Sequence, residues 1–172
     1  MRKKYIISVI SDSHGEICKY IIPYLKKSDY IFHAGDICST KIIMDLHKYC
    51  DNVFLVAGNN DIPEKYTDKN DKKIINNLKK SQTIKILGED VSIEHGDRFG
   101  HHADHDRLRK LYPDSKLIIY GHTHNQALDK EKNPWVINPG ACGYTRNNDG
   151  GPCFIQIEIN ENNWNIIPYC FS

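Results

Sequence analysis

Residues 5 to 15 read Tyr5-Ile6-Ile7-Ser8-Val9-Ile10-Ser11-Asp12-Ser13-His14-Gly15, a short run rich in β-branched residues that passes directly into a polar turn. Runs of this length that end in turn residues are typical of buried strands. A basic start invites comparison with a secretory signal peptide, but the apolar part contains two serines and no small-residue cleavage site follows it. We therefore expect a buried first strand whose end carries Asp12 and His14.

Strands and helices alternate through the first third of the chain. Strands are expected at 5–11, 30–34 and 52–57, and helices at 16–27 and 41–49. Such alternation predicts a parallel sheet with right-handed crossovers and helices on its faces. The polar segment 64–82 is expected to be a solvated surface segment with one short amphipathic turn, the alternative being a binding arm.

Strands dominate from residue 83 onward. They are expected at 83–87, 91–95, 116–120, 135–138, 154–159 and 164–169, with one helix near 103–111. The turn residues Asn160-Glu161-Asn162-Asn163 predict a hairpin between the last two strands. We expect an α/β fold in which two sheets pack together with helices outside, forming one domain over residues 1–172.

The composition is that of a soluble globular protein, with 40% hydrophobic and 26% charged residues over 172 positions. No apolar run approaches the roughly 20 residues that a membrane helix needs, so no membrane partner is expected. Lys plus Arg is 23 and Asp plus Glu is 22, a net charge of +1. Because nucleic acids are held mainly by phosphate neutralisation, this balance argues against stable nucleic-acid binding.

The six cysteines are not spaced for a known cysteine motif. They are Cys18, Cys38, Cys50, Cys142, Cys153 and Cys170, and no two form a C-x-x-C pair, which excludes zinc-ribbon and thioredoxin-like motifs. Without an export signal we expect a cytoplasmic protein whose cysteines are reduced, small buried apolar residues.

Metal-binding residue types follow the predicted strands in five separate segments. They are Asp12 and His14, then Asp36, then Asn59, then His95, and finally His122 with His124. A glycine accompanies each segment, and glycine permits sharp turns and close backbone approach. Because the loops beyond the carboxyl ends of strands converge in open α/β sheets, we expect these side chains to share one rim.

Seven oxygen and imidazole donors exceed what one metal ion needs. A single catalytic zinc uses about three protein ligands, so seven predict two ions. Donors of this mixed kind without thiolate fit manganese, iron, zinc or a related divalent ion and do not select among them. Asp36, in the middle of the order, is the candidate bridging carboxylate.

The ordered set of motifs resembles the calcineurin-like metallophosphoesterase superfamily. The motifs are Asp12-Ser13-His14-Gly15, Gly35-Asp36, Gly58-Asn59-Asn60-Asp61, His95-Gly96 and Gly121-His122-Thr123-His124. The short length and Asn138-Pro139-Gly140 are similar to its small phosphodiesterase branch, which also includes the retromer subunit Vps29. The resemblance implies a four-layer α/β/β/α sandwich of two mixed sheets flanked by helices.

The resemblance also implies roles for individual residues. Asp12, His14 and His124 would hold one metal ion, Asn59, His95 and His122 the other, and Asp36 both. Manganese is the first expectation, with zinc, iron, nickel and magnesium as alternatives. A hydroxide bridging two divalent ions would attack the phosphorus atom in line. Asp61 and Asp97 are expected to accept hydrogen bonds from the metal-binding imidazoles.

Asn60 departs from the family pattern, because many relatives carry a histidine there that contacts phosphate and protonates the leaving group. An amide binds phosphate but transfers no proton, so we expect either an activated leaving group or another proton donor. Asn60 and Asp61 are thus the candidate catalytic residues beside the metal ligands.

Two further features are candidates for supporting roles. In His101-His102-Ala103-Asp104-His105 we expect an exposed helix start, with a replacement acid at His101 or His105 as the alternative. Arg146 is expected on the surface, with a phosphate clamp as the alternative.

Three hypotheses for the function follow. The leading one is a metal-dependent phosphodiesterase acting on a small phosphoester. The second is a phosphomonoesterase with the same site, and the third is a non-catalytic binding subunit similar to Vps29, which the presence of all seven donors disfavours. A homodimer is compatible with the sequence, although no heptad or apolar stripe requires one.

Overall fold

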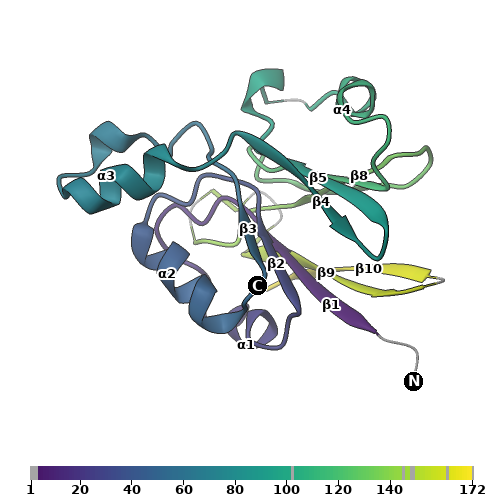
Figure 1. Cartoon of the computed structure of the whole chain (residues 1–172), viewed down its shortest axis with the longest axis horizontal. Helices are drawn as coiled ribbons and strands as arrows, with labels where there is room; N and C mark the ends of the chain where they lie inside the picture. The colour runs from purple at the N-terminus through teal and green to yellow at the C-terminus, as the bar shows by residue number, and fades with distance from the viewer. Residues whose placement is uncertain (1–3, 102, 145, 148–149, 162, 172) are drawn as a thin grey trace.

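Two five-stranded sheets lie face to face, with helices on both outer sides (Figure 1). The computed structural model describes residues 4–101, 103–144, 146–147, 150–161 and 163–171. The first sheet has the order β10-β9-β1-β2-β3 and the second the order β4-β5-β6-β8-β7. This is the predicted four-layer α/β/β/α arrangement of two mixed sheets, and the fold prediction is confirmed.

Each sheet contains three adjacent parallel strands, at one side of the first sheet and in the middle of the second. In the first sheet, β1 (Tyr5–Ile10), β2 (Tyr30–His33) and β3 (Val53–Leu55) are parallel, while β9 (Cys153–Asn160) and β10 (Asn163–Cys170) form an antiparallel hairpin. In the second sheet, β5 (Glu89–Glu94), β6 (Leu117–Ile119) and β8 (Trp135–Pro139) are parallel, with β4 (Ser81–Ile86) and β7 (Gln126–Asp129) antiparallel at the edges.

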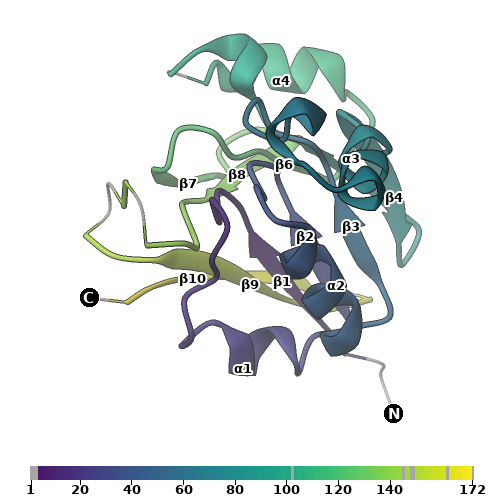
Figure 2. The ribbon, with the colours of Figure 1, turned by 90° about the vertical axis from the view of Figure 1, so that its left-hand side faces the viewer.

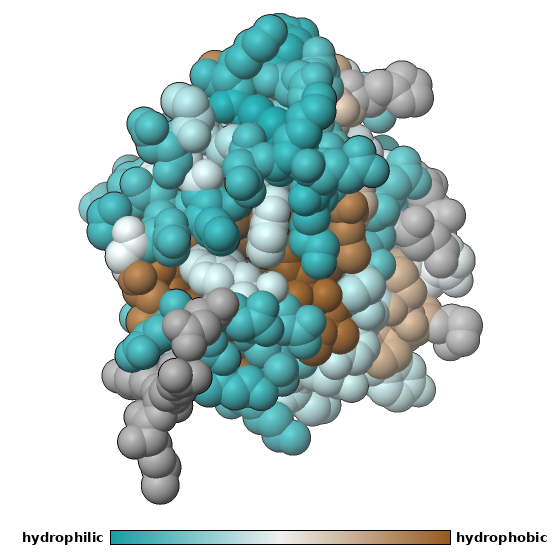
Figure 3. Space-filling view, turned by 90° about the vertical axis from the view of Figure 1, so that its right-hand side faces the viewer, coloured by the Kyte–Doolittle hydropathy of each residue, from teal (hydrophilic) through white to brown (hydrophobic). Residues whose placement is uncertain are grey.

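Alternating side chains connect the four layers. In β6, Leu117 and Ile119 enter the apolar cluster between the sheets, whereas Ile118 packs beneath the outer helix. In β2, Phe32 faces the other sheet and Ile31 faces the outer helices. This period of two is what a strand buried on both faces requires. On the face seen in Figure 3, apolar side chains surface in a band across an otherwise mostly hydrophilic surface.

The helices lie outside the sheets (Figure 2). They are α1 (Ile22–Leu25), α2 (Thr40–Tyr49), α3 (Lys69–Asn76) and α4 (His105–Leu111), with 3-10 turns at Pro63–Lys65 and Asp97–Phe99. Leu25, Leu46 and Ile75 join the cluster that covers the first sheet, and Leu108 of α4 covers the second. In the described residues no helix is long and apolar enough to cross a membrane.

Three local predictions are wrong or incomplete. The helix expected at 16–27 is reduced to the four residues of α1, because the backbone N–H of Cys18 bonds to the carbonyl of Cys142 instead of continuing a helix. Segment 64–82 contains the eight-residue helix α3, begun by Asp68, whose side chain accepts from the N–H groups of Asn70 and Asp71. The edge strand β7 was not predicted, since its sequence lacks apolar alternation.

The expectation of six reduced cysteines is also wrong. Cys153 and Cys170 form a disulfide, while Cys18, Cys38, Cys50 and Cys142 are free. The hairpin register places Cys170 directly opposite Cys153. Spacing along the chain does not reveal such a pair, because it depends on strand register. Of the turn predicted between these strands, Asn162 lies outside the described residues.

Candidate metal centre

The loops that follow β1, β2, β3, β5 and β6 bring all seven predicted donors together. The first two loops run side by side, since the N–H groups of Asp12 and His14 bond to the carbonyls of Gly35 and Asp36. The N–H of Gly121 bonds to the carbonyl of His95 and ties the second sheet's loops in the same way. The predicted rim is therefore built by the ends of three adjacent parallel strands of the first sheet and two of the second.

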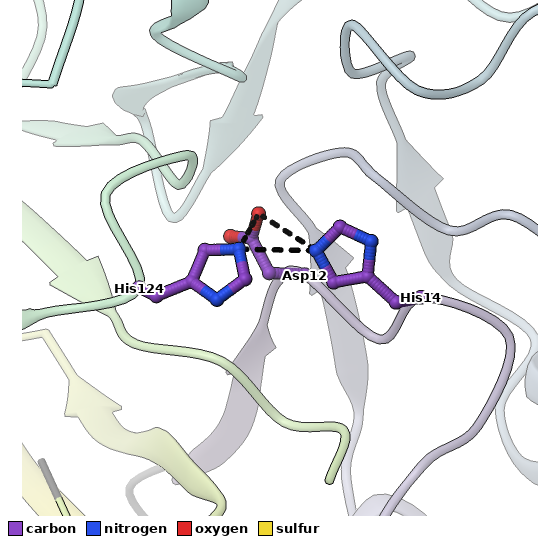
Figure 4. Close-up of side chains that lie close together, drawn as sticks. All are labelled: Asp12, His14 and His124. Atoms are coloured by element: carbon purple, nitrogen blue, oxygen red, sulfur yellow. Dashed lines mark hydrogen bonds and ion pairs between the residues drawn. The ribbon is translucent and has the colours of Figure 1, made fainter. Parts of the chain in front are cut away.

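The first group consists of Asp12, His14 and His124, whose side chains point toward one another (Figure 4). The Nε2 atoms of the two histidines are 3.0 Å apart. Nε2 of His124 lies 3.2 Å and Nε2 of His14 lies 4.0 Å from Oδ1 of Asp12. Three ligand atoms that converge in this way are the arrangement expected of a metal site.

The second group gathers around the side-chain oxygen of Asn59. This oxygen lies 3.2 Å from Nε2 of His95 and 3.1 Å from Nδ1 of His122. Nε2 of His95 is also 3.4 Å from Oδ1 of Asp36. Asp36 reaches the first group as well, because its Oδ2 lies 3.9 Å from Nε2 of His14. One carboxylate thus faces both groups, one oxygen to each.

Backbone carbonyls orient two of the imidazoles. Nδ1 of His95 is 2.7 Å from the carbonyl of Ala34, and Nδ1 of His124 is 2.9 Å from the carbonyl of Arg146. A carbonyl accepts only from an N–H, so Nδ1 of each ring carries a proton and Nε2 is directed at the carboxylates.

Asp61 does not have the predicted role of accepting from an imidazole. Its carboxylate accepts from the backbone N–H groups of Gly58 at 2.8 Å, Ile37 at 3.1 Å and Cys38 at 2.7 Å. Asp61 therefore fastens the loop after β2 to the loop after β3. Asp97 is exposed at the start of a 3-10 turn, and among the described residues it accepts no hydrogen bond from His95 or His122.

The buried carboxylates favour a cation. Burial raises the pKa of Asp12, but the hydrogen bond from His124 and the charge of His95 outweigh it and lower the pKa. The pKa of Asp36 is likewise lowered, because contacts with His95 and Asn60 outweigh burial. Burial opposes the protonation of His95, yet Asp36 and Asp12 raise its pKa to about 9. Oδ1 of Asp12 is buried, and Nε2 of His124 lies 3.2 Å and Nε2 of His14 4.0 Å from it. A buried carboxylate oxygen facing imidazole nitrogens fits a divalent metal ion.

Strained backbone accompanies the donors. Asp12, His14, Asp36, His122 and His124 all have positive φ, between 44° and 68°. Non-glycine residues in this region cost of order 1–3 kcal/mol each and cluster at functional sites. The fold therefore holds five of the seven donors in conformations that local preference disfavours.

Gly58 leaves room for Asp36. A Cβ atom at Gly58 would lie 2.2 Å from Oδ1 of Asp36 and 2.3 Å from its backbone nitrogen. Even an alanine cannot fit there unless Asp36 moves. The glycine that precedes Asn59 is thus required by packing against the central carboxylate.

A cavity of about 310 Å³ opens over the donors. Its walls combine candidate ligands with other polar side chains: Asp36, Asn59, Asn60, His101, His122, Thr123, His124 and Arg146. Asn60 lies in this wall, and Nζ of Lys65 donates to its Oδ1 at 3.2 Å. Lys65 carried no sequence signal, and Thr123 belonged to a motif only as the residue between His122 and His124.

His101 and His105, considered together in the sequence, separate in the structure. The ring of His101 stacks on that of His122, with centroids 5.6 Å apart, so it lies in the cavity wall before α4 begins. Both ring nitrogens of His105 have partners elsewhere, Asp129 at 2.8 Å and the hydroxyl of Tyr120 at 2.9 Å. His105 is therefore a structural residue, and His102 lies outside the described residues.

Arg146 is exposed, as expected, but lies in the cavity wall beside the candidate ligands. Asn138 shapes the neighbouring turn, as its amide donates to the carbonyl of Gly121 at 2.8 Å and its oxygen accepts from the N–H of Gly140 at 2.9 Å.

Comparison with known proteins agrees with this geometry. A probable metallophosphoesterase of Mycoplasma genitalium is 29% identical over 165 residues, covering 90% of this chain and 88% of the relative. A phosphodiesterase of Methanocaldococcus jannaschii is 28% identical over 156 residues, covering 80% of this chain and 85% of the relative. The structure of vacuolar protein sorting 29 from Cryptosporidium parvum has the same fold, with a TM-score of 0.76, 20% identity and 98% coverage of both chains.

The family description that matches this sequence is the calcineurin-like phosphoesterase superfamily domain, over residues 6–162. This family uses divalent metals, and Asp12, His14 and His124 are one group of candidate ligands for such an ion. The chain belongs to the calcineurin-like phosphoesterase superfamily.

Proposed function

We propose that this protein is a metal-dependent phosphodiesterase that hydrolyses a small phosphodiester at a centre of two divalent ions. The observation that carries the proposal is the position of Asp36, whose two carboxylate oxygens face separate groups of donors. Asp12, His14 and His124 would hold one ion, and Asn59, His95 and His122 the other. When bound, two such ions supply an activated water for in-line attack and neutralise charge on the phosphate.

The protein's own residues prepare the site for that chemistry. The carbonyls of Ala34 and Arg146 keep His95 and His124 aimed inward. The three hydrogen bonds accepted by Asp61 hold the Asp36 and Asn59 loops together, so we propose a positioning role for it. Manganese is the metal we would test first, followed by zinc, iron, nickel and magnesium.

Asn60 favours a diester with a good leaving group. Its side-chain amide donates to Oδ2 of Asp36 at 2.7 Å and has no transferable proton. General acid assistance contributes about 10²–10⁴-fold, so its absence penalises poor alkoxide leaving groups most. Because all seven donors converge, a hydrolytic role is favoured over a purely scaffolding one.

The test is hydrolysis of a chromogenic aryl phosphodiester beside the corresponding monoester, with chelator-treated protein and added manganese. We expect manganese to restore cleavage of the diester and to have little effect on the monoester. A preference for the monoester would replace the proposal by a phosphomonoesterase. Cleavage of neither ester by protein that binds two metal ions per chain would contradict the hydrolytic proposal for such esters and favour a binding subunit.

A further inference from the structure

We infer that Arg146 is a phosphate-binding residue, whose guanidinium holds the non-bridging oxygens of the substrate phosphate. The inference deepens the proposed function and rests on it for the identity of the substrate. Arg146 lies in the wall of the 310 Å³ cavity, and its Nη2 is 3.1 Å from Nε2 of His14.

The backbone of Arg146 is held at the site. The carbonyl of Arg146 accepts from Nδ1 of His124 at 2.9 Å. The side-chain amide of Asn147 donates to the carbonyls of Ala141 at 3.2 Å and Gly143 at 2.8 Å, which anchors the chain on the other side. Since the carbonyl orients a candidate ligand and the side chain extends into the cavity, substitution of the side chain tests the guanidinium alone.

The charge of Arg146 is directed at the site instead of at a structural carboxylate. Arg98 pairs with Glu94, and Arg109 pairs with Asp129. Among the described residues no carboxylate forms an ion pair with Arg146, and its guanidinium contacts the imidazole of His14. The side chain is exposed and can adjust to a ligand.

Electrostatics then selects the ligand. When divalent cations are bound at the neighbouring ligands, they repel the guanidinium unless an anion lies between the cations and the guanidinium. Phosphate meets this requirement, and its oxygens match the planar donors of arginine, which bind two of them at once. A lysine at this position would supply the charge without the paired donors.

The experiment compares R146Q and R146K with the parent and with R107Q. Arg107 is an exposed residue of α4 whose guanidinium lies over the ring of Phe99, so R107Q removes the same charge away from the cavity. Binding of inorganic phosphate to the manganese-loaded proteins is measured by calorimetry, and bound manganese by elemental analysis. We expect phosphate to bind about 10- to 100-fold more weakly to R146Q, with a smaller loss in R146K and none in R107Q. Bound manganese should be unchanged in all four proteins.

Two results would overturn the inference. One is phosphate affinity in R146Q equal to that in R107Q. The other is loss of manganese from R146Q, which would make the guanidinium a support of the metal groups instead of a phosphate ligand. If the parent cleaves no chromogenic ester but R146Q still binds phosphate more weakly, the proposed function fails while the phosphate-binding role of Arg146 holds.

Discussion

Asn60 donates to both oxygens of Asp36, from its backbone N–H to Oδ1 at 2.8 Å and from its side-chain amide to Oδ2 at 2.7 Å. The residue that departs most clearly from the family pattern is thus attached to the carboxylate that faces both donor groups. A histidine at this position would have one ring N–H for the same task and a second nitrogen for the substrate. Asn60 therefore keeps the hydrogen bonds to Asp36 but cannot donate a proton to the leaving group.

Asn60→His should consequently restore proton transfer to the leaving group. We expect the ratio of turnover for poor alkyl leaving groups to turnover for good aryl ones to rise by about 10²-fold. Asn60→Ala is the matched control, because it removes the side-chain contact with Asp36 without adding an acid. The measurement is kcat for a series of diesters of increasing leaving-group pKa. An identical dependence in the two variants would contradict the argument.

The donors could be predicted from sequence, because each directly follows a strand and is therefore placed by local pattern. Asp12 and His14 need only a strand and a turn to be recognised. The residues that orient these donors could not be predicted, because they come from loops that are distant in the sequence and meet only in the fold. Arg146 reaches His14 across 132 positions of sequence, and the tie between Cys18 and Cys142 replaces a predicted helical hydrogen bond. The strained φ angles of five donors also contradict local preference and arise only from tertiary contacts.

Asp36→Asn should remove bound metal and abolish turnover. The substitution keeps the shape of the side chain but removes the negative charge that both donor groups share. We expect turnover to fall by more than about 100-fold, together with less manganese per chain by elemental analysis. Asp45→Asn is the control, since Asp45 is paired on the surface of α2 with Lys41 and Lys48. Parental activity in Asp36→Asn would refute a bridging role.

Gly58→Ala should weaken metal binding although it replaces none of the candidate metal ligands. The added Cβ would lie 2.2 Å from Oδ1 of Asp36, so the carboxylate must shift. We expect manganese affinity to fall by about 10- to 100-fold, the usual effect of disturbing the surroundings of a metal ligand. Gly88→Ala is the comparison: it has φ of +86° but no atom within 4 Å of the added Cβ. It should destabilise the fold by roughly 1 kcal/mol and leave metal affinity unchanged. Equal metal affinity in the two variants would show that Asp36 tolerates the shift.

His33 should make the metal-free protein less stable in mild acid. Its ring is fully buried beneath the site, with Nε2 2.9 Å from Oγ of Ser13, while Nδ1 has no partner among the described residues. Because the hydroxyl of Ser13 donates to the carbonyl of Ile37, Nε2 carries the proton of a neutral ring. Burial lowers the pKa of His33 to about 4 from 6.5, although the charges of Asp61, Asp12 and Asp36 act in the opposite direction.

Because the pKa of His33 is lower in the folded chain than in the unfolded chain, the free energy of unfolding decreases as the pH falls. Above about pH 6.5 the ring is neutral in both the folded and the unfolded chain, and its contribution to stability is complete. As the pH falls toward 4, the unfolded chain takes up a proton that the folded chain does not, so stability falls by roughly 1.4 kcal/mol per pH unit from this group. Urea unfolding of the parent and of His33→Gln, both with chelator, isolates the effect, since glutamine can still donate to Ser13. We expect the free energy of unfolding of the parent to fall more steeply than that of the variant between pH 6.5 and 4.5, whereas parallel curves would show that His33 accepts a proton inside the folded protein.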